Sequence, residues 1–265
     1  MKSINRILCA FFMMCISQVS LAVTMVELRQ GDGSVDKMYF EGMKVRVDSG
    51  SEPGYMIIDV KNNKVIAVSH EERKIIDMGS VNQAEEDAQG QPLNIQFVNK
   101  GKGPKIVGYS TKHYQVVVNG QKCSDEYVSK KLPKDLGIEK VLGKMLAGEP
   151  DMEMMGGVDM DPCLLAEPQI SKMFSNYGYP LRSIRANGEL DVEVVRVNRK
   201  ASLPSGGFSL PKGYQRVDMV KMMQNFQKNM PEMTPEGMKN VSPEQLQQMK
   251  QTLEQMMKKM GQPEQ

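Results

Sequence analysis

The first half of the chain alternates hydrophobic and polar residues, which is the pattern of β-strands. In KVRVDS, residues 44–49, Val45 and Val47 fall on one face, and Arg46 falls on the other with its charged neighbours. This two-residue period is typical of an antiparallel strand with one buried and one exposed face. Similar runs continue to about residue 129 and predict one strand after another.

Pairs of asparagine and glycine between these runs predict tight hairpins. Asn62-Asn63 separates the two runs of YMIIDVKNNKVIAVS, and Asn119-Gly120 follows the run HYQVVV. Asn187-Gly188 joins two alternating runs later in the chain. Because these residues tolerate the positive φ angles of short hairpin turns, we predict an antiparallel meander.

Helical spacing appears between the two strand-rich regions. KDLGIEKVLGKMLAG, residues 134–148, places five hydrophobic side chains along one helical face: Leu136, Val141, Leu142, Met145 and Leu146. LLAEPQISKMFSNYGY, residues 164–179, continues the helical layer, with an interruption expected at Pro168. Strands, a helical interlude and returning strands together predict an α+β fold, in which helices cover one face of an antiparallel sheet.

The C-terminal part, residues 218–265, has a different character. Sixteen of the 24 methionines lie from Met145 onward. We predict a methionine-rich helical tail, broken near Pro231 and Pro235, whose last helix carries an apolar stripe of Leu246, Met249, Leu253, Met256, Met257 and Met260. The stripe either docks on the chain's own sheet, binds a partner or a second copy, or frays in solution.

The N-terminus predicts a cleaved signal peptide over residues 1–22. A basic start is followed by an apolar run from Ile7 to about Val19, and Ser20 and Ala22 stand at positions −3 and −1 of the cleavage site. The run is shorter than the roughly 20 residues that cross a bilayer as a helix, so no transmembrane anchor is expected. We therefore expect a periplasmic protein with one domain, residues 23–217, before the tail.

The charge balance argues against a nucleic-acid partner. The chain has 34 basic and 32 acidic residues, and cleavage removes Lys2 and Arg6 but no acid, which leaves 32 of each. A neutral chain with mixed charges gives no support for a general field that attracts nucleic acid or an anionic membrane.

Two cysteines remain after cleavage, Cys123 and Cys163. In an oxidising compartment a disulfide between them is the default prediction, and two separate buried thiols are the alternative. The bridge would close a loop of about 40 residues and stabilise the fold by roughly 3 to 4 kcal/mol.

The stretch DMEMMGGVDMDPC, residues 151–163, is a candidate soft-metal site. Met152, Met154, Met155 and Met160 would supply thioether ligands for Cu(I), with Cys163 as a further ligand if it is not in a disulfide. The alternative is a mobile connection between the helices and the returning strands, with its methionines as a flexible apolar flap.

Four segments of the chain resemble those of a known family. IVGYSTKHYQVVVNGQ, DEYV, YGYPLRS and GFSLPKGY are similar to recurring segments of the secreted bacterial domain-of-unknown-function family 4412. The resemblance covers most of residues 24–217. It implies a fold similar to that of periplasmic lipoprotein carriers, in which a curved antiparallel half-barrel cradles lipid or acyl chains beneath covering helices. A hydrophobic ligand groove is implied, without a particular ligand.

No residue pattern indicates catalysis. His70 and His113 are the only histidines, they lie in separate β-rich segments, and no nucleophile elbow, zincin helix or phosphate loop accompanies them. We predict a non-enzymatic protein without a cofactor, which binds a lipid or an apolar protein segment between sheet and helices. The alternatives are copper binding, or a structural role in which the C-terminal helices meet a protein partner or another copy.

Overall fold

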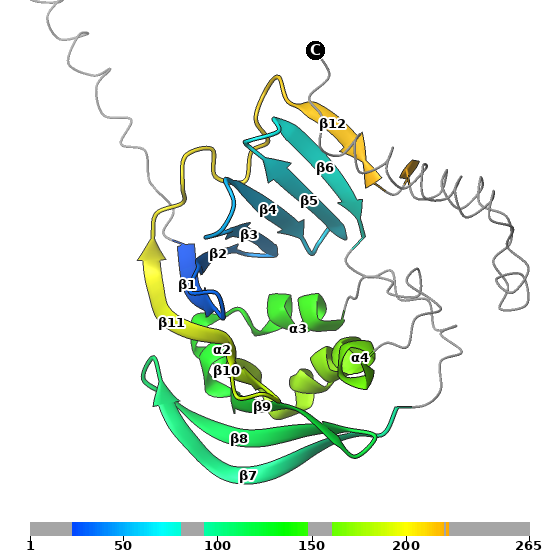
Figure 1. Cartoon of the computed structure of the whole chain (residues 1–265). Coiled ribbons are helices and arrows are strands. Elements are labelled where there is room, and N and C mark those ends of the chain that lie inside the picture. The colour runs from blue at the N-terminus through cyan, green and yellow to red at the C-terminus, as the bar shows by residue number, and fades with distance from the viewer. Residues whose placement is uncertain (1–22, 81–92, 148–160, 220, 223–265) are drawn as a thin grey trace, which may run out of the picture.

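A computed structural model describes residues 23–80, 93–147, 161–219, 221 and 222 of the chain, and the fold concerns these residues. They form one open, curved sheet with helices on the inside of the curve (Figure 1). The predicted antiparallel sheet with helical cover is therefore confirmed. Most of the predicted methionine-rich tail, and the predicted signal peptide, lie outside the described residues.

Two meanders make up the sheet. The first contains β1 (Val23–Gln30), β2 (Val35–Glu41), β3 (Lys44–Asp48), β4 (Gly54–Asp59), β5 (Lys64–Ser69) and β6 (Lys74–Gly79). The second contains β7 (Ile95–Ile106), β8 (Tyr109–Val118), β9 (Gln121–Ser129), β10 (Tyr179–Arg185) and β11 (Leu190–Ala201). The helices α2 (Lys131–Leu136), α3 (Glu139–Ala147) and α4 (Pro162–Tyr177) connect β9 to β10.

The two meanders join where β1 pairs with β11. The strand order is β12-β6-β5-β4-β3-β2-β1-β11-β10-β9-β8-β7. All neighbouring pairs are antiparallel except β12 (Gln215–Asp218), which returns to the far edge and lies parallel to β6. After the second meander the chain thus returns to the first one and adds a strand to its free edge.

The turns predicted at the asparagine-containing pairs are present in the structure. Asn63 has φ 53°, and Asn119 and Gly120 have φ 52° and 85°, which is the two-residue turn that their sequence predicts. Gly188 also takes a positive φ, 88°, between β10 and β11. These hairpins are local features, so the residues at each turn determine them.

The predicted helix over residues 134–148 is instead two helices, α2 and α3. Gly137 takes the left-handed conformation, φ 68°, and its N–H donates to the carbonyl of Lys134 at 3.1 Å. Glycine adopts this conformation without a steric penalty and commonly ends helices in this way. The apolar spacing continues across the break, which is why the pattern alone suggested one helix.

The expected interruption at Pro168 is wrong, because α4 continues through it. The carboxylate of Asp161 caps the helix by accepting from the Cys163 N–H at 2.9 Å, and Pro162 occupies the first turn. A proline at 168 removes the hydrogen bond to the Leu164 carbonyl. The helix nevertheless continues to Tyr177.

Most apolar side chains are buried between the sheet and the helices. We call the larger group the inner core: Val26, Met38, Phe40, Val45, Ile58, Val60, Ile106, Leu132, Leu136, Ile138, Val141, Leu142, Leu181 and Val194. A second cluster packs α4 on β8 and β9: Tyr114, Val116, Val118, Val128, Ala166, Ile170 and Phe174. Burial of each large side chain stabilises the fold by roughly 1.5 to 3 kcal/mol.

The outer face of the first meander is also covered. We call residues 202–214 the covering segment. Its side chains Phe208, Leu210 and Tyr214 pack against Tyr55 and its neighbours on β4 to β6. The prediction that Arg46 lies on an exposed face is therefore wrong. Its guanidinium lies 3.8 Å from the centre of the Tyr55 ring, and it donates to the carbonyl of Gly207 and, at 2.6 Å, to Asp48.

Candidate binding site at the sheet opening

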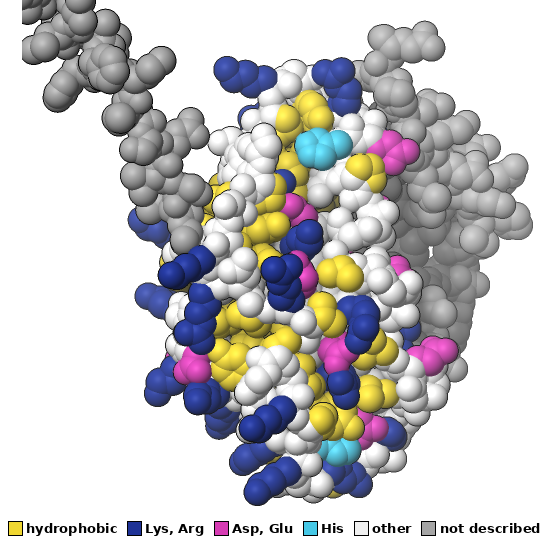
Figure 2. Space-filling model, turned by 90° about the vertical axis from the view of Figure 1, so that its left-hand side faces the viewer, with side chains coloured by type: hydrophobic (Ala, Val, Ile, Leu, Met, Phe, Trp, Pro, Cys, Tyr) yellow, Lys and Arg dark blue, Asp and Glu magenta, His cyan; other side chains and the backbone are white. Residues whose placement is uncertain are grey.

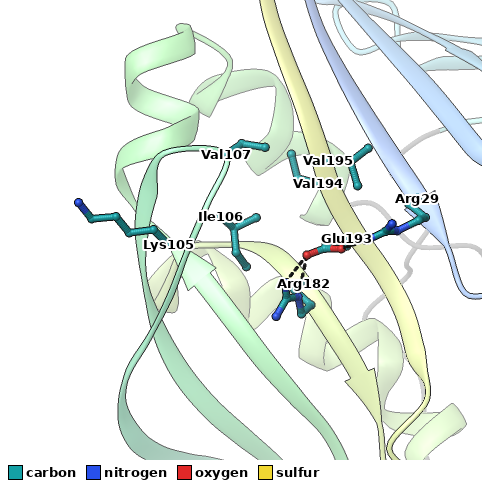
Figure 3. A pocket seen from close by; sticks show the side chains of 8 residues that line it. All are labelled: Arg29, Lys105, Ile106, Val107, Arg182, Glu193, Val194 and Val195. Atoms are coloured by element: carbon teal, nitrogen blue, oxygen red, sulfur yellow. Dashed lines mark hydrogen bonds and ion pairs between the residues drawn. The ribbon is translucent and has the colours of Figure 1, made fainter.

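An open pocket of about 250 Å³ lies between the β7–β8 hairpin tip, residues 105–109, and β11. We call it the sheet opening (Figure 3). It is lined by Arg29, Lys105, Ile106, Val107, Arg182, Glu193, Val194 and Val195. The lining thus combines aliphatic and charged side chains from β1, β10, β11 and the hairpin tip.

Irregular strand pairing surrounds the opening. The β1–β11 register passes from Glu27↔Arg196 to Leu28↔Val194, which leaves Val195 as an extra residue on β11. In β10, Leu181 is extra in the same way, and the β7–β8 register also shifts between Lys102 and Lys105. Bulges bend strands and redirect side chains, so their concentration here shapes the walls of the pocket.

The aliphatic side of the opening is continuous with the hydrophobic interior. Ile106 and Val194 line the pocket and are also members of the inner core, and Val107 packs against that core. In Figure 3 these residues face one another across the gap, with Val195 beside Val194. An apolar group that enters the opening therefore contacts side chains of the inner core.

The charged side is a triad of two arginines about one carboxylate. Arg182 donates from Nε to Oε1 of Glu193 at 2.9 Å and also from Nη2, and Arg29 donates from Nη2 to Oε2. Burial alone would raise the pKa of Glu193, but the hydrogen bonds from Arg182 and Arg29 outweigh it and lower that pKa. Glu193 is therefore a carboxylate at neutral pH.

An aromatic platform supports Arg182. The ring of Tyr127 stacks on His113 at 4.6 Å between centres, and the Arg182 guanidinium lies 5.8 Å from the Tyr127 ring centre. Gly103 permits this arrangement, because a Cβ there would lie 2.7 Å from the Tyr127 ring and 2.3 Å from Oγ1 of Thr111. The close approach of the hairpin thus needs glycine at this position.

A second unusual group lies on the inner face. Glu126 is only 4% exposed, and its Oε1 accepts hydrogen bonds from Ser124 at 2.7 Å and Ser183 at 2.8 Å. Its Oε2 has no hydrogen-bond partner among the described residues. Burial raises the pKa of Glu126 to about 7 in spite of the two serine hydrogen bonds.

A known protein family matches most of the chain. The family model described as "Domain of unknown function (DUF4412)" matches residues 20–214. The chain belongs to the DUF4412 family. That match includes both meanders, the three helices, the sheet opening and the covering segment.

Other comparisons add little to the DUF4412 assignment. No curated protein matches the chain. Among solved structures, it is similar to an uncharacterized conserved protein from Thermus thermophilus, with 12% identity and a TM-score of 0.39. The alignment covers 76% of this chain and 91% of that one, and so weak a likeness supports no conclusion about function.

The predicted disulfide of this DUF4412 chain is confirmed. Cys123 and Cys163 are bonded, with their Cα atoms 5.4 Å apart, and the bridge ties β9 to the first turn of α4. The disulfide is compatible with an extracellular location. Cys163 is therefore not available as a thiolate ligand. The candidate copper ligands Met152, Met154, Met155 and Met160 lie outside the described residues.

The two histidines lie in different parts of the fold. His70 meets the Tyr214 hydroxyl through Nδ1 at 2.9 Å on the outer face of the first meander. His113 contacts Oδ1 of Asp125 through Nε2 at 2.8 Å in the second meander.

Among the described helices, none is long and apolar enough to cross a membrane.

The residues of the sheet opening were not predicted from sequence. Arg29, Arg182 and Glu193 come from three strands far apart in the chain, so no local pattern connects them. One signal was available: Val194-Val195 interrupts the two-residue alternation of LDVEVVRVN. Such a change of phase within a strand indicates a bulge, and bulges often border functional sites.

Proposed function

We propose that this protein is a non-enzymatic periplasmic binding protein, whose ligand is a lipid or an apolar protein segment that enters at the sheet opening. The observation that carries the proposal is the double role of Ile106 and Val194, which line the opening and belong to the inner core. Half of the lining residues are aliphatic and half are charged, so the opening places polar groups at the mouth of an apolar interior, where such groups can orient a ligand.

The composition of the interior supports the same proposal. Met38 is part of the inner core, and Met43, Met56 and Met145 pack against it. Methionine is unbranched and flexible, so these side chains can repack around an aliphatic chain at low cost. Each methylene transferred from water to such an interior contributes roughly 0.8 kcal/mol, which would offset the cost of moving the helices.

A neutral fluorescent probe tests the proposal directly. N-phenyl-1-naphthylamine should bind the purified, delipidated protein saturably, with enhanced emission. Val195→Trp should fill the sheet opening and weaken that binding by about tenfold, because the indole takes the space of the ligand. Native mass spectrometry of the protein as isolated should also show a bound lipid.

The matched control is Val117→Trp, at a half-buried position of β8 away from the opening. This variant should bind the probe as the unmodified protein does, and circular dichroism should show both variants folded. Absence of saturable binding in the unmodified protein, or equal binding by the two variants, would show that the opening is not a ligand entrance.

A further inference from the structure

We propose that the sheet opening selects an anionic amphiphile, an aliphatic chain that carries a carboxylate or phosphate group, and that Arg29 and Arg182 bind this head group. The inference rests on the proposed function and specifies the chemistry of its ligand. Three independent features of the described residues support it: the number of hydrogen-bond donors, the two-sided lining of the pocket and the charge around it.

The two arginines have more donors than their carboxylate uses. Each guanidinium carries five N–H groups. Glu193 accepts one hydrogen bond from Arg29 and two from Arg182, and no other described residue accepts from either guanidinium. The Arg29 side chain is 48% exposed, so its remaining donors are accessible from the opening. A planar carboxylate or a phosphate matches such donors.

Glu193 holds the arginines in place without cancelling their charge. Two positive groups and one negative group leave the triad with a net positive charge. The carboxylate fixes both guanidinium groups, and the Tyr127 ring supports Arg182 from one side. An incoming anion therefore meets donors that are already oriented, which reduces the entropy cost of binding.

The pocket is polar at one end and aliphatic at the other. Figure 3 shows the triad on one side of the gap, and Val107, Val194 and Val195 on the other. A free anion would leave these valines without a partner, whereas a neutral chain would cover the guanidinium groups without pairing them, which costs free energy. A molecule with both parts satisfies both ends.

The surroundings of the opening are strongly basic. Residues 93–118 contain four lysines and no acidic residue, and all four are exposed: Lys100, Lys102, Lys105 and Lys112. The end of β11 adds Arg199 and Lys200, and Arg199 donates to the Tyr109 hydroxyl at 3.0 Å, which places the two groups together. Figure 2 shows Lys and Arg side chains gathered along the left and lower parts of this face, among hydrophobic atoms. Such a field attracts anions and accelerates their association.

Titration calorimetry with matched probes tests the head group. The probes are decanoate, decyl phosphate, 1-decanol and inorganic phosphate, added to delipidated protein. The two anionic amphiphiles are kept below their critical micelle concentrations, and 1-decanol is kept below its solubility limit. Because charge-assisted hydrogen bonds favour the anions, decanoate and decyl phosphate should bind at least about tenfold more tightly than 1-decanol. Inorganic phosphate should bind at least about tenfold more weakly than decyl phosphate.

Three variants assign the effect to the triad. Arg29→Gln should weaken decanoate binding by about tenfold and leave 1-decanol binding unchanged, and Arg29→Lys should lie between. The control Arg196→Gln removes the same charge from a side chain that is 62% exposed on β11, and should change decanoate binding less than about twofold. Thermal unfolding should show that all three variants fold.

The outcomes separate this inference from the proposed function. Equal affinities for decanoate and 1-decanol would overturn the anionic head group and leave the apolar site intact. Inorganic phosphate binding as tightly as decyl phosphate would show a free-anion site and overturn the amphiphile. Equal effects of Arg29→Gln and Arg196→Gln would overturn the assignment to the triad. Failure of every aliphatic probe and of N-phenyl-1-naphthylamine would overturn both proposals.

Discussion

Glu126 shows how a single buried group makes stability depend on pH. Its carboxyl group lies on the inner face opposite Tyr114, which packs in the α4 cluster, and only two serine hydroxyls offset its burial. Burial raises the pKa from the usual 4.5 to about 7. The folded protein therefore binds this proton more tightly than the unfolded chain does. The resulting stabilisation is complete below about pH 4.5 and is lost as pH rises through 7.

Glu126→Gln should remove this pH dependence, because the amide is neutral throughout and still accepts from both serines. A shift from 4.5 to about 7 corresponds to roughly 3 kcal/mol, so the difference in unfolding free energy between pH 5 and pH 8 should shrink by about 2 to 3 kcal/mol. Urea unfolding at both pH values measures it. Glu71→Gln, at an exposed turn, is the control and should keep the pH dependence of the unmodified protein. If Glu126→Gln keeps the same pH dependence as this control, Glu126 is not the group responsible.

Arg46 is a second residue whose removal should be costly. It connects β3 to the covering segment through the Gly207 carbonyl and also pairs with Asp48 and Tyr55. Arg46→Met keeps most of the packing but leaves the Asp48 carboxylate and the Gly207 carbonyl unpaired. We expect a loss of about 2 to 3 kcal/mol in urea unfolding, against less than about 1 kcal/mol for the exposed Arg196→Met. Similar losses for the two variants would show that the covering segment does not depend on Arg46.

At the level of elements, the disulfide links a strand to the helix that covers it. The bridge between Cys123 and Cys163 closes a loop with a sequence separation of 40, which includes α2 and α3. The double variant Cys123→Ser and Cys163→Ser should therefore lose about 3 to 4 kcal/mol of unfolding free energy. Hydrogen exchange should increase most in α4 and least in β4 and β5, which are on the other meander. An unchanged midpoint in urea would contradict a stabilising role for the bridge.

The elements that sequence predicted well are those determined by neighbouring residues. Asn119-Gly120 and the alternation on either side of it define a hairpin without help from the rest of the chain. Pro168 and Gly137 were harder to place, because the apolar pattern reports neither whether a helix continues through a proline nor the left-handed conformation at Gly137. The exposure of Arg46 was wrong because its cover comes from residues more than 150 positions later.

The site was least predictable because it depends on how the whole sheet is assembled. Arg29 on β1 and Arg182 on β10 lie close together only after β1 has paired with β11, a contact between opposite ends of the domain. The charge balance could not locate the site for the same reason. Nearly equal numbers of acids and bases say nothing about where each kind lies, and the hairpin that carries four lysines and no acid comes to lie beside a basic end of β11.

This uneven charge should govern how the whole molecule meets charged surfaces. The protein should be retained on a sulfonate cation exchanger at pH 7.5 and low salt, although its net charge is only +2, or zero after the predicted cleavage, since the basic face acts as a local patch. Replacement of Lys100, Lys102, Lys105 and Lys112 by Gln should lower the salt concentration of elution more than the same change at Lys61, Lys130, Lys134 and Lys140. Both variants lose four charges from exposed lysines, so any difference reports position rather than net charge. Equal elution of the two would mean that total charge, and not the patch beside the sheet opening, controls these contacts.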